Sequence, residues 1–334
     1  MIKIGINGFN RIGKMIFYSA IKNKNIKIVA INKINIKDLI YILKYDSIHK
    51  LPKLNIIIDK KYNNIIVNNK HIIRITNEND NLDWKSVDAK YIIETTGNFI
   101  DEKSLLNHIK YGAKKVIITY PPKDENIPIF VIGVNHKLIN KYNNIIYYAS
   151  STTNCLSPIL KILHREFEII ECLITIINSN YNDFNIIDDI NKNYILGRSI
   201  LCNIIPYKKK IYKEIYKIIP EIKGKIKDIS YLVPNINNVS IVDLTIRIKK
   251  STNYDNIKKI IKFYSKNELS GILGYINNDI VSTDILDDTR ISIFDAKAGI
   301  MLNPNFFKII CWYDNEIGYS NKIINFIEYI EYNI

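Results

Sequence analysis

The sequence predicts an α/β protein whose first half forms a doubly wound parallel sheet. In this half, short apolar runs typical of strands alternate with helical segments, the order that a parallel sheet requires. A glycine-rich turn also follows the first apolar run, over Gly5–Gly13. Such a turn between a strand and a helix presents backbone amides and the helix N-terminus to a pyrophosphate. We therefore expect a Rossmann-type dinucleotide-binding domain in this half.

Length and composition agree with a protein of two domains. At about 150 residues per domain, 334 residues suffice for two, and 47% of them are hydrophobic. No apolar run is long enough to span a membrane and no signal peptide is visible, so we expect a cytoplasmic protein. The cysteines lack metal-ligand spacing and are interpreted as free thiols, with no metal site: they are Cys155, Cys172, Cys202 and Cys311.

The net charge of +14 raises the alternative of a nucleic-acid-binding protein. Against it, Lys, Asn, Ile and Tyr dominate the composition, while arginine occurs at only six positions. This profile favours residues with A/T-rich codons, so lysine accumulates on solvated faces without a dedicated partner. We prefer that interpretation, and nucleic-acid binding remains the less favoured alternative.

In the first half, the sequence predicts a strand, then the glycine turn and then a helix, followed by further strands. After the glycine turn, apolar residues recur at helical spacing, at Ile12, Ile16, Phe17 and Ala20. The expected strands are Lys3–Asn7, Ile28–Asn32, Asn55–Asp59, Asn64–Val67 and Ile72–Thr76.

A candidate chemical site follows the apolar run Ile145–Tyr148, which is typical of a buried strand. The next residues, Ala149–Pro158, read Ala-Ser-Ser-Thr-Thr-Asn-Cys-Leu-Ser-Pro and open a helix. Hydroxyl side chains suit the first positions of a helix, where they satisfy amides that lack intrahelical partners. A helix N-terminus also favours developing negative charge.

Four segments resemble the phosphorylating glyceraldehyde-3-phosphate dehydrogenase family. The candidate site resembles its A-S-C-T-T-N-C segment, and the glycine turn resembles its G-I-N-G-F-G-R-I-G segment, with Asn10 in place of one glycine. Asn238–Thr245 and Trp312–Ser320 match almost word for word. Because Asn can adopt the left-handed backbone region, we interpret this replacement as tolerable.

The resemblance implies a domain organisation and an activity. It implies an NAD(P)-binding domain over residues 1–150 and an α+β catalytic domain with a mainly antiparallel sheet over 151–316. A C-terminal helix over 317–334 would return to the first domain. The implied activity is the glycolytic oxidation of glyceraldehyde 3-phosphate with NAD and phosphate, in a homotetramer.

The resemblance also implies site residues. The cofactor-binding set is Gly8, Arg11, Ile12, Lys33, Thr96, Thr119 and Asn315, with Asn315 orienting the nicotinamide carboxamide. Ser150 and Thr152 are the implied substrate-binding residues. Lys33 stands where the family has an acidic residue that binds the adenosine ribose. We expect weakened NAD binding; a preference for NADP, through its 2′-phosphate, is the less favoured alternative.

The positions that perform the family's chemistry depart from its pattern. Ser151 occupies the position of the nucleophilic Cys, and Asn178 that of the His base. Leu232 replaces a phosphate-binding Arg, while Tyr181 and Lys209–Lys210 replace further phosphate-binding residues. An alcohol without a proton acceptor is a poor nucleophile, so we expect strongly reduced or lost activity.

Three hypotheses remain open at this point. The chain is an active dehydrogenase with an unusual site, a catalytically dead nucleotide-binding or scaffold protein, or a nucleic-acid binder. Cys155 is the one candidate for a substitute nucleophile, although one helical turn beyond Ser151 we expect it to face the core.

Overall fold

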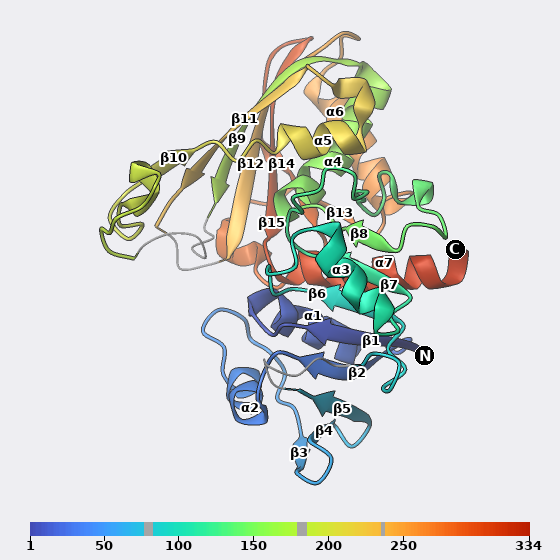
Figure 1. The fold of residues 1–334 in the computed structure, drawn as a ribbon. Helices are drawn as coiled ribbons and strands as arrows, with labels where there is room; N and C mark the ends of the chain where they lie inside the picture. The colour runs from blue at the N-terminus through green and yellow to red at the C-terminus, as the bar shows by residue number, and fades with distance from the viewer. Residues whose placement is uncertain (77–82, 179–185, 235–237) are drawn as a thin grey trace. The chain divides into compact units, whose positions relative to one another are not determined.

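The structure, a computed structural model, describes residues 1–76, 83–178, 186–234 and 238–334. These residues form two compact units, each built around its own sheet (Figure 1). The first unit holds Met1–Phe130, His136–Ser150 and Ser320–Ile334, and the second holds Val131–Asn135 and Ser151–Tyr319. Tyr181, which was predicted to replace a phosphate-binding residue, lies outside the described residues.

The sheet of the first unit confirms the predicted doubly wound fold. Its strand order is β3-β4-β5-β2-β1-β6-β7-β8, and neighbours from β5 to β8 run parallel. The central strands are buried on both faces, which explains their nearly continuous apolar runs. The strands are β1 Ile2–Asn7, β2 Ile26–Asn32, β3 Ile56–Asp59, β4 Asn64–Val67, β5 His71–Ile75, β6 Tyr91–Glu94, β7 Lys115–Ile118 and β8 Ile145–Tyr147.

Three of the described helices of this unit begin at polar N-cap residues, and α7 packs into the core. They are α1 Arg11–Lys22, α2 Ile36–Lys44, α3 Glu102–Lys110 and, from Ser320 onward, α7 Ile317–Asn333. The side chains of Asn10, Asn35 and Asp101 cap the N-termini of α1, α2 and α3 by accepting a backbone N–H three residues later. In α7, Phe326 packs against Phe130 and Tyr148 within the same unit.

The second unit contains the mainly antiparallel sheet that was predicted. Its order is β10-β11-β9-β12-β15-β14-β13, and only the β11/β9 and β13/β14 pairs are parallel among the described strands. The strands are β9 Ile169–Asn178, β10 Ile205–Tyr207, β11 Ile226–Leu232, β12 Val239–Ile248, β13 Leu273–Ile276, β14 Ser292–Asn303 and β15 Phe306–Asp314.

Helices cover one face of this second sheet. They are α4 Ser151–Phe167, α5 Tyr212–Ile218 and α6 Tyr254–Lys266. Along β12, buried residues alternate with half-buried ones, as expected for strands with one covered face. Short 3₁₀ turns occupy Tyr194–Gly197, Pro220–Ile222 and Ser282–Ile285, and one in the first unit occupies His136–Leu138. None of the described helices is long and apolar enough to cross a bilayer.

Candidate functional site

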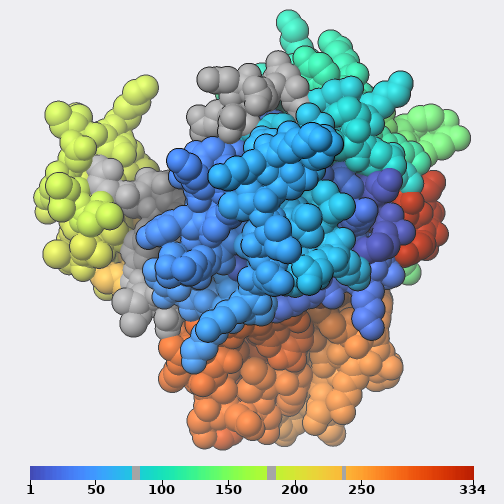
Figure 2. All heavy atoms as spheres, turned by 90° about the horizontal axis from the view of Figure 1, so that it is seen from below, coloured from blue at the N-terminus to red at the C-terminus, as the bar shows by residue number. Residues whose placement is uncertain are grey.

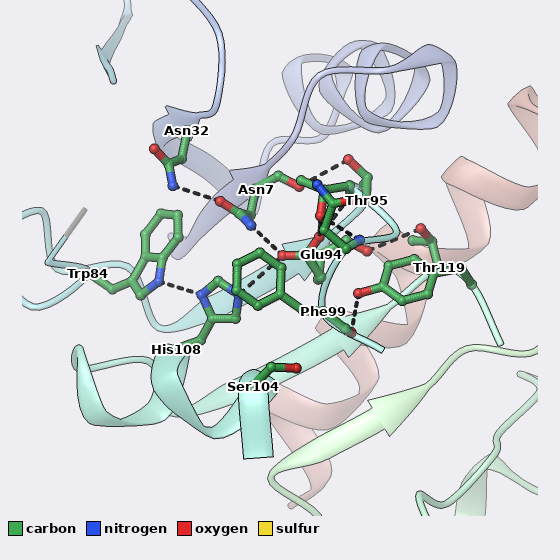
Figure 3. Close-up of polar contacts among 12 residues, drawn as sticks. Asn7, Asn32, Trp84, Glu94, Thr95, Phe99, Ser104, His108 and Thr119 are labelled. Carbon is green, nitrogen blue, oxygen red and sulfur yellow. Dashed lines mark hydrogen bonds and ion pairs between the residues drawn. The ribbon is translucent and has the colours of Figure 1, made fainter. Parts of the chain in front are cut away.

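Polar side chains end three neighbouring parallel strands in the first unit. Asn7 ends β1, Asn32 ends β2 and Glu94 ends β6, and all three are buried. Asn32 Nδ2 donates to Asn7 Oδ1 at 2.7 Å, and Asn7 Nδ2 donates to Glu94 Oε2 (Figure 3). These bonds fix the carboxyl ends of the strands, the edge at which open α/β sheets bind ligands.

The Glu94 carboxylate is also held by groups beyond the strands. Thr96 donates its backbone N–H and its hydroxyl to Oε1, at 2.7 and 2.6 Å. Trp84 Nε1 donates to His108 Nδ1 at 3.0 Å, so Nδ1 is an acceptor and the ring proton lies on Nε2. His108 Nε2 then donates to Glu94 Oε2 at 3.1 Å (Figure 3). With four donors, this carboxylate orders the strand ends.

The glycine turn has no room for side chains at two positions. Gly8 has φ +91°, and a Cβ atom there would lie 2.7 Å from Thr96 Cγ2. A Cβ atom at Gly13 would lie 2.7 Å from the Gly8 carbonyl oxygen. The turn therefore packs tightly against Thr95 and Thr96, which follow β6, and α1 packs closely against the turn.

Asn10, which replaces a glycine of the family's turn, does not use the left-handed backbone region. Asn10 has φ −75° and ψ −170°, an extended backbone, because it is the N-cap of α1. Its Oδ1 accepts the Gly13 N–H at 3.0 Å, and its Nδ2 donates to the Thr95 carbonyl at 2.6 Å. The Asn therefore caps the helix and ties it to the turn after β6, so no glycine-like conformation is needed.

The implied cofactor residues of this unit lie along the same edge. Lys33, with φ 69°, follows β2 and lines a cavity of about 110 Å³ together with Asn7, Asn32 and Phe99. Thr119 follows β7, and its hydroxyl donates to the Glu94 carbonyl at 3.1 Å. Gly8, Arg11, Ile12 and Thr96 lie in the two turns described above. A tight turn, a helix N-terminus and a cation fit a phosphate-bearing dinucleotide.

Arg11 has a structural partner in this unit. Its Nη1 lies 2.6 Å from Asp46 Oδ2, and Lys14 Nζ lies 2.7 Å from the same oxygen. The backbone amides of Ile48 and His49 donate to Asp46 Oδ1. Burial alone would raise the pKa of Asp46, but these hydrogen bonds outweigh it and hold the pKa well below its ordinary value.

In the second unit, Ser151 is the first residue of α4, directly after Ser150. Ser151 Oγ donates to Asn315 Oδ1 at 3.4 Å, a long and weak hydrogen bond. Asn315 Nδ2 donates to Ser240 Oγ at 2.7 Å and to the Asn238 carbonyl at 2.8 Å. Ser240 Oγ donates to Asn178 Oδ1 at 3.0 Å. A directed chain of hydrogen bonds thus connects Ser151 with Asn178 through Asn315 and Ser240.

This chain contains only neutral groups. Asn178 ends β9, Ser240 lies in β12 and Asn315 follows β15, so three adjacent strands hold it. No hydroxyl or amide among the four side chains titrates near neutral pH. The arrangement orients the Ser151 hydroxyl without withdrawing its proton.

The next residues of α4 face the interior. Thr152 is 1% exposed, and its hydroxyl forms a 2.7 Å hydrogen bond with the Tyr313 hydroxyl. Cys155 is fully buried, as expected, and burial raises the pKa of its thiol to about 12. Cys155 is therefore a protonated core residue at neutral pH.

An apolar cluster surrounds Leu232. This side chain is 1% exposed and packs with Ile200 and Ile205, next to Leu196 and Tyr207. Lys209 and Lys210 follow β10 and are exposed. The Leu232 position therefore contributes no hydrogen-bond donor to an anion.

Comparisons with known proteins identify the family. A model described as "Glyceraldehyde 3-phosphate dehydrogenase, NAD binding domain" matches residues 2–102, and one described as the C-terminal domain of the same enzyme matches residues 150–315. The chain belongs to the glyceraldehyde-3-phosphate dehydrogenase family. The two matches together contain every implied site residue except Thr119.

Relatives within the glyceraldehyde-3-phosphate dehydrogenase family align over nearly the full length. The chain is 44% identical to the enzyme of Cochliobolus lunatus, over 99% of this chain and 98% of that protein. It is 42% identical to the cytosolic enzyme of Pisum sativum, over 98% of each chain. It is 43% identical to glyceraldehyde-3-phosphate dehydrogenase A of Escherichia coli, over 98% of this chain and 99% of that protein.

Sequence reasoning missed two sets of residues. Asn238 and Ser240 lie in a segment that resembles the family, but nothing in their pattern indicated hydrogen bonds to Asn315. Trp84, Glu94 and His108 are too far apart in the chain to form a recognisable motif, and strand pairing and α3 bring them together. A buried acid at a strand end was the one available signal.

We predict that Asp46→Asn lowers the free energy of unfolding at pH 7 by about 3 kcal/mol, because it leaves two buried or half-buried cations poorly paired. The depressed pKa in the folded state stabilises the protein above the unfolded pKa of about 3.9, and this stabilisation is lost as the pH falls further. Urea unfolding of the wild type and of Asp46→Asn measures the two free energies of unfolding. We expect the difference between them to become smaller below about pH 4.

The control for this experiment is Asp88→Asn, which removes an exposed carboxylate that pairs with Lys3 in the same unit. We expect this variant to unfold almost like the wild type. Equal destabilisation by both variants would contradict a special role for Asp46.

Proposed function

We propose that this family member retains a dinucleotide-binding domain and has strongly reduced or lost phosphorylating dehydrogenase activity. The observation that carries the proposal is the chain from Ser151 to Asn178, which offers the Ser151 hydroxyl only neutral partners. The family's glycolytic reaction, which the resemblance implies, begins with attack of a thiolate on the aldehyde. An alcohol is a much weaker acid than a thiol and needs a general base for the same step.

The expected decrease in the reaction rate follows from the absence of both the nucleophilic thiol and its base. Removing one member of such a pair lowers the rate by roughly 10⁴- to 10⁶-fold. Cys155 offers no replacement, because its thiol is buried and its pKa is raised to about 12. The apolar surroundings of Leu232 further support the loss of the phosphate-dependent step.

The proposed cofactor is NAD(H), bound along the carboxyl edge of the first sheet. Gly8 would allow close approach of the pyrophosphate, with Arg11 and Ile12 in the first turn of α1 and Thr96 and Thr119 at the ends of β6 and β7. A bound nicotinamide would accept hydride, and Asn315 is proposed to orient its carboxamide, as the resemblance implies. Lys33 cannot accept hydrogen bonds from the ribose hydroxyls, which weakens NAD binding and leaves NADP as the alternative.

We predict that Lys33→Asp strengthens NAD binding by roughly tenfold, the value of one charge-assisted hydrogen bond. Calorimetric titration of both proteins with NAD and NADP measures the change. Lys24→Asp, the same charge change at an exposed position of this unit, is the matched control. If the wild type binds NAD tightly and Lys33→Asp binds it equally well, the role proposed for Lys33 is wrong.

We predict that the wild-type protein, given glyceraldehyde 3-phosphate, phosphate and NAD, produces NADH no faster than the background rate of the assay. The combined variant Ser151→Cys with Asn178→His restores both a thiol and a base, and we expect it to raise the rate by roughly 100-fold or more. Ser151→Cys alone should have a smaller effect, because its thiol lacks the base.

Cys155→Ala in both backgrounds is the control for this restoration and should leave each rate unchanged. Wild-type turnover at rates typical of the family, persisting after thiol alkylation, would refute the proposed loss. If the wild type binds NAD but has no turnover, the result favours the alternative of a nucleotide-binding or scaffold protein.

We extend the proposal to the assembly and location of the protein, as a homotetramer in the cytoplasm. The relative from Pisum sativum, which is described as cytosolic, is a precedent for the location. Support for self-association comes from exposed apolar side chains between residues 186 and 204, a segment shown in yellow-green in Figure 2. The side chains are Ile186, Ile187, Ile190, Tyr194, Ile195, Leu201 and Ile204. Large exposed apolar surfaces mark interaction sites.

We predict that Ile187→Lys combined with Ile190→Lys shifts the protein to a smaller species. Size-exclusion chromatography with light scattering measures the mass. Leu138→Lys, at another exposed apolar position, is the control and should preserve the wild-type mass. An unchanged mass in the double variant would remove this segment from the proposed interface.

A further inference from the structure

We propose that a basic cavity beside α6 binds a small compound that carries phosphate groups. The cavity has a volume of about 340 Å³ and is lined by residues from α6, β13, the loop between them and the segment before β14. The side chains that matter are Lys262, Ser265, Lys266, Ser270, Tyr275 and Arg290. It lies entirely within the second unit and shares no lining residue with the Ser151 chain.

The cavity carries an excess of positive charge. Lys258, Lys262 and Lys266 follow one another at a spacing of four residues, so they occupy one face of α6. Lys258 pairs with Asp255, whereas no carboxylate among the described residues forms an ion pair with Lys262 or Lys266. Like charges at this spacing repel each other, and a bound anion would remove the repulsion.

The negative end of the helix dipole accounts for only part of this charge. Cations near a helix C-terminus are favourable, and Lys262 and Lys266 lie in the last two turns of α6. The dipole does not explain why Arg290, from the segment before β14, lines the same cavity. The charge of the two lysines and the N–H donors of a guanidinium from a separate element line one cavity, which indicates a site for an anion.

Arg290 is held in a fixed position. Its Nε and Nη2 donate to the Asp288 carboxylate, at 3.0 and 2.6 Å. The guanidinium lies against Gly274 of β13, where a Cβ atom would approach Nη1 to 2.8 Å. A fixed planar guanidinium loses little freedom when it binds a phosphate. Since Asp288 neutralises Arg290, the two lysines supply the net charge.

Size and lining define the class of ligand. Small-molecule sites occupy about 300–1,000 Å³, so this cavity suits a compact molecule. The Tyr275 ring lies 5.3 Å from Lys262 Nζ, measured to its centroid, and forms an apolar wall beside the charge. The Ser270 hydroxyl adds a donor for a phosphate oxygen.

The experiment is a titration with pyrophosphate followed by fluorine NMR. The full-length protein is labelled with 3-fluorotyrosine. The fluorine resonance that disappears in Tyr275→Phe belongs to Tyr275. We expect pyrophosphate to shift this resonance with saturation, and sodium chloride of equal ionic strength not to shift it. Inorganic phosphate alone should bind more weakly. Because the readout is local to Tyr275, binding at the first unit's glycine turn does not affect it.

The variant Lys262→Gln with Lys266→Gln should weaken this binding by at least about tenfold, since it removes both unpaired charges. The matched control is Lys258→Gln with Lys259→Gln, which removes two positive charges from the same helix at positions that do not line the cavity. We expect its affinity for pyrophosphate to be within about twofold of that of the wild type. An unmoved Tyr275 resonance, or equal weakening in both variants, would overturn the site. Neither result depends on NAD binding or turnover, so this test and that of the proposed function fail independently.

Discussion

A buried carboxylate must have its charge compensated by hydrogen bonds, and the first unit meets this requirement at Glu94. The donors come from the end of β1, the turn after β6 and α3, so three elements are fixed by one side chain. Asn32 extends the network to β2 through Asn7. The carboxyl edge of the sheet, where the glycine turn and Lys33 lie, is rigid because these bonds are made within the protein.

The second unit orients its candidate site in a different way. Its side chains form a chain of hydroxyl and amide groups, in which each donor direction is fixed by the next acceptor. Order is achieved there without charge, so there is no ionised group whose pKa the surroundings can tune. A site of this kind can hold a polar ligand in place, but it lacks the proton acceptor that activation of an alcohol requires.

Much of this architecture could be predicted from the sequence, because the relevant signals are local. The glycine turn, the strand before Ser151 and the apolar face of α7 each lie within a short segment, and the structure contains all three. At Asn10 the sequence indicated only that the replacement of a glycine is tolerable, because an asparagine can adopt a left-handed backbone or cap a helix. Hydrogen-bond partners on both sides of the side chain decided for the cap.

The unpredicted parts depend on contacts between distant segments. Trp84 determines which nitrogen of His108 carries the proton, and no spacing in the sequence links these residues. Likewise, the strand order places Asn178, Ser240 and Asn315 side by side, although 137 residues separate the first from the last. Such networks become visible only when the register of the sheet is known.

The cap formed by Asn10 has a consequence for the linkage between ligand binding and folding. Its side chain already occupies the Gly13 amide, one of the groups that a bare helix N-terminus would offer to a phosphate. One N–H group of the first turn of α1 therefore has a partner within the protein before any ligand arrives. A dinucleotide would therefore gain less by organising this turn than it would with glycine at position 10, and the protein depends less on its cofactor to remain folded there.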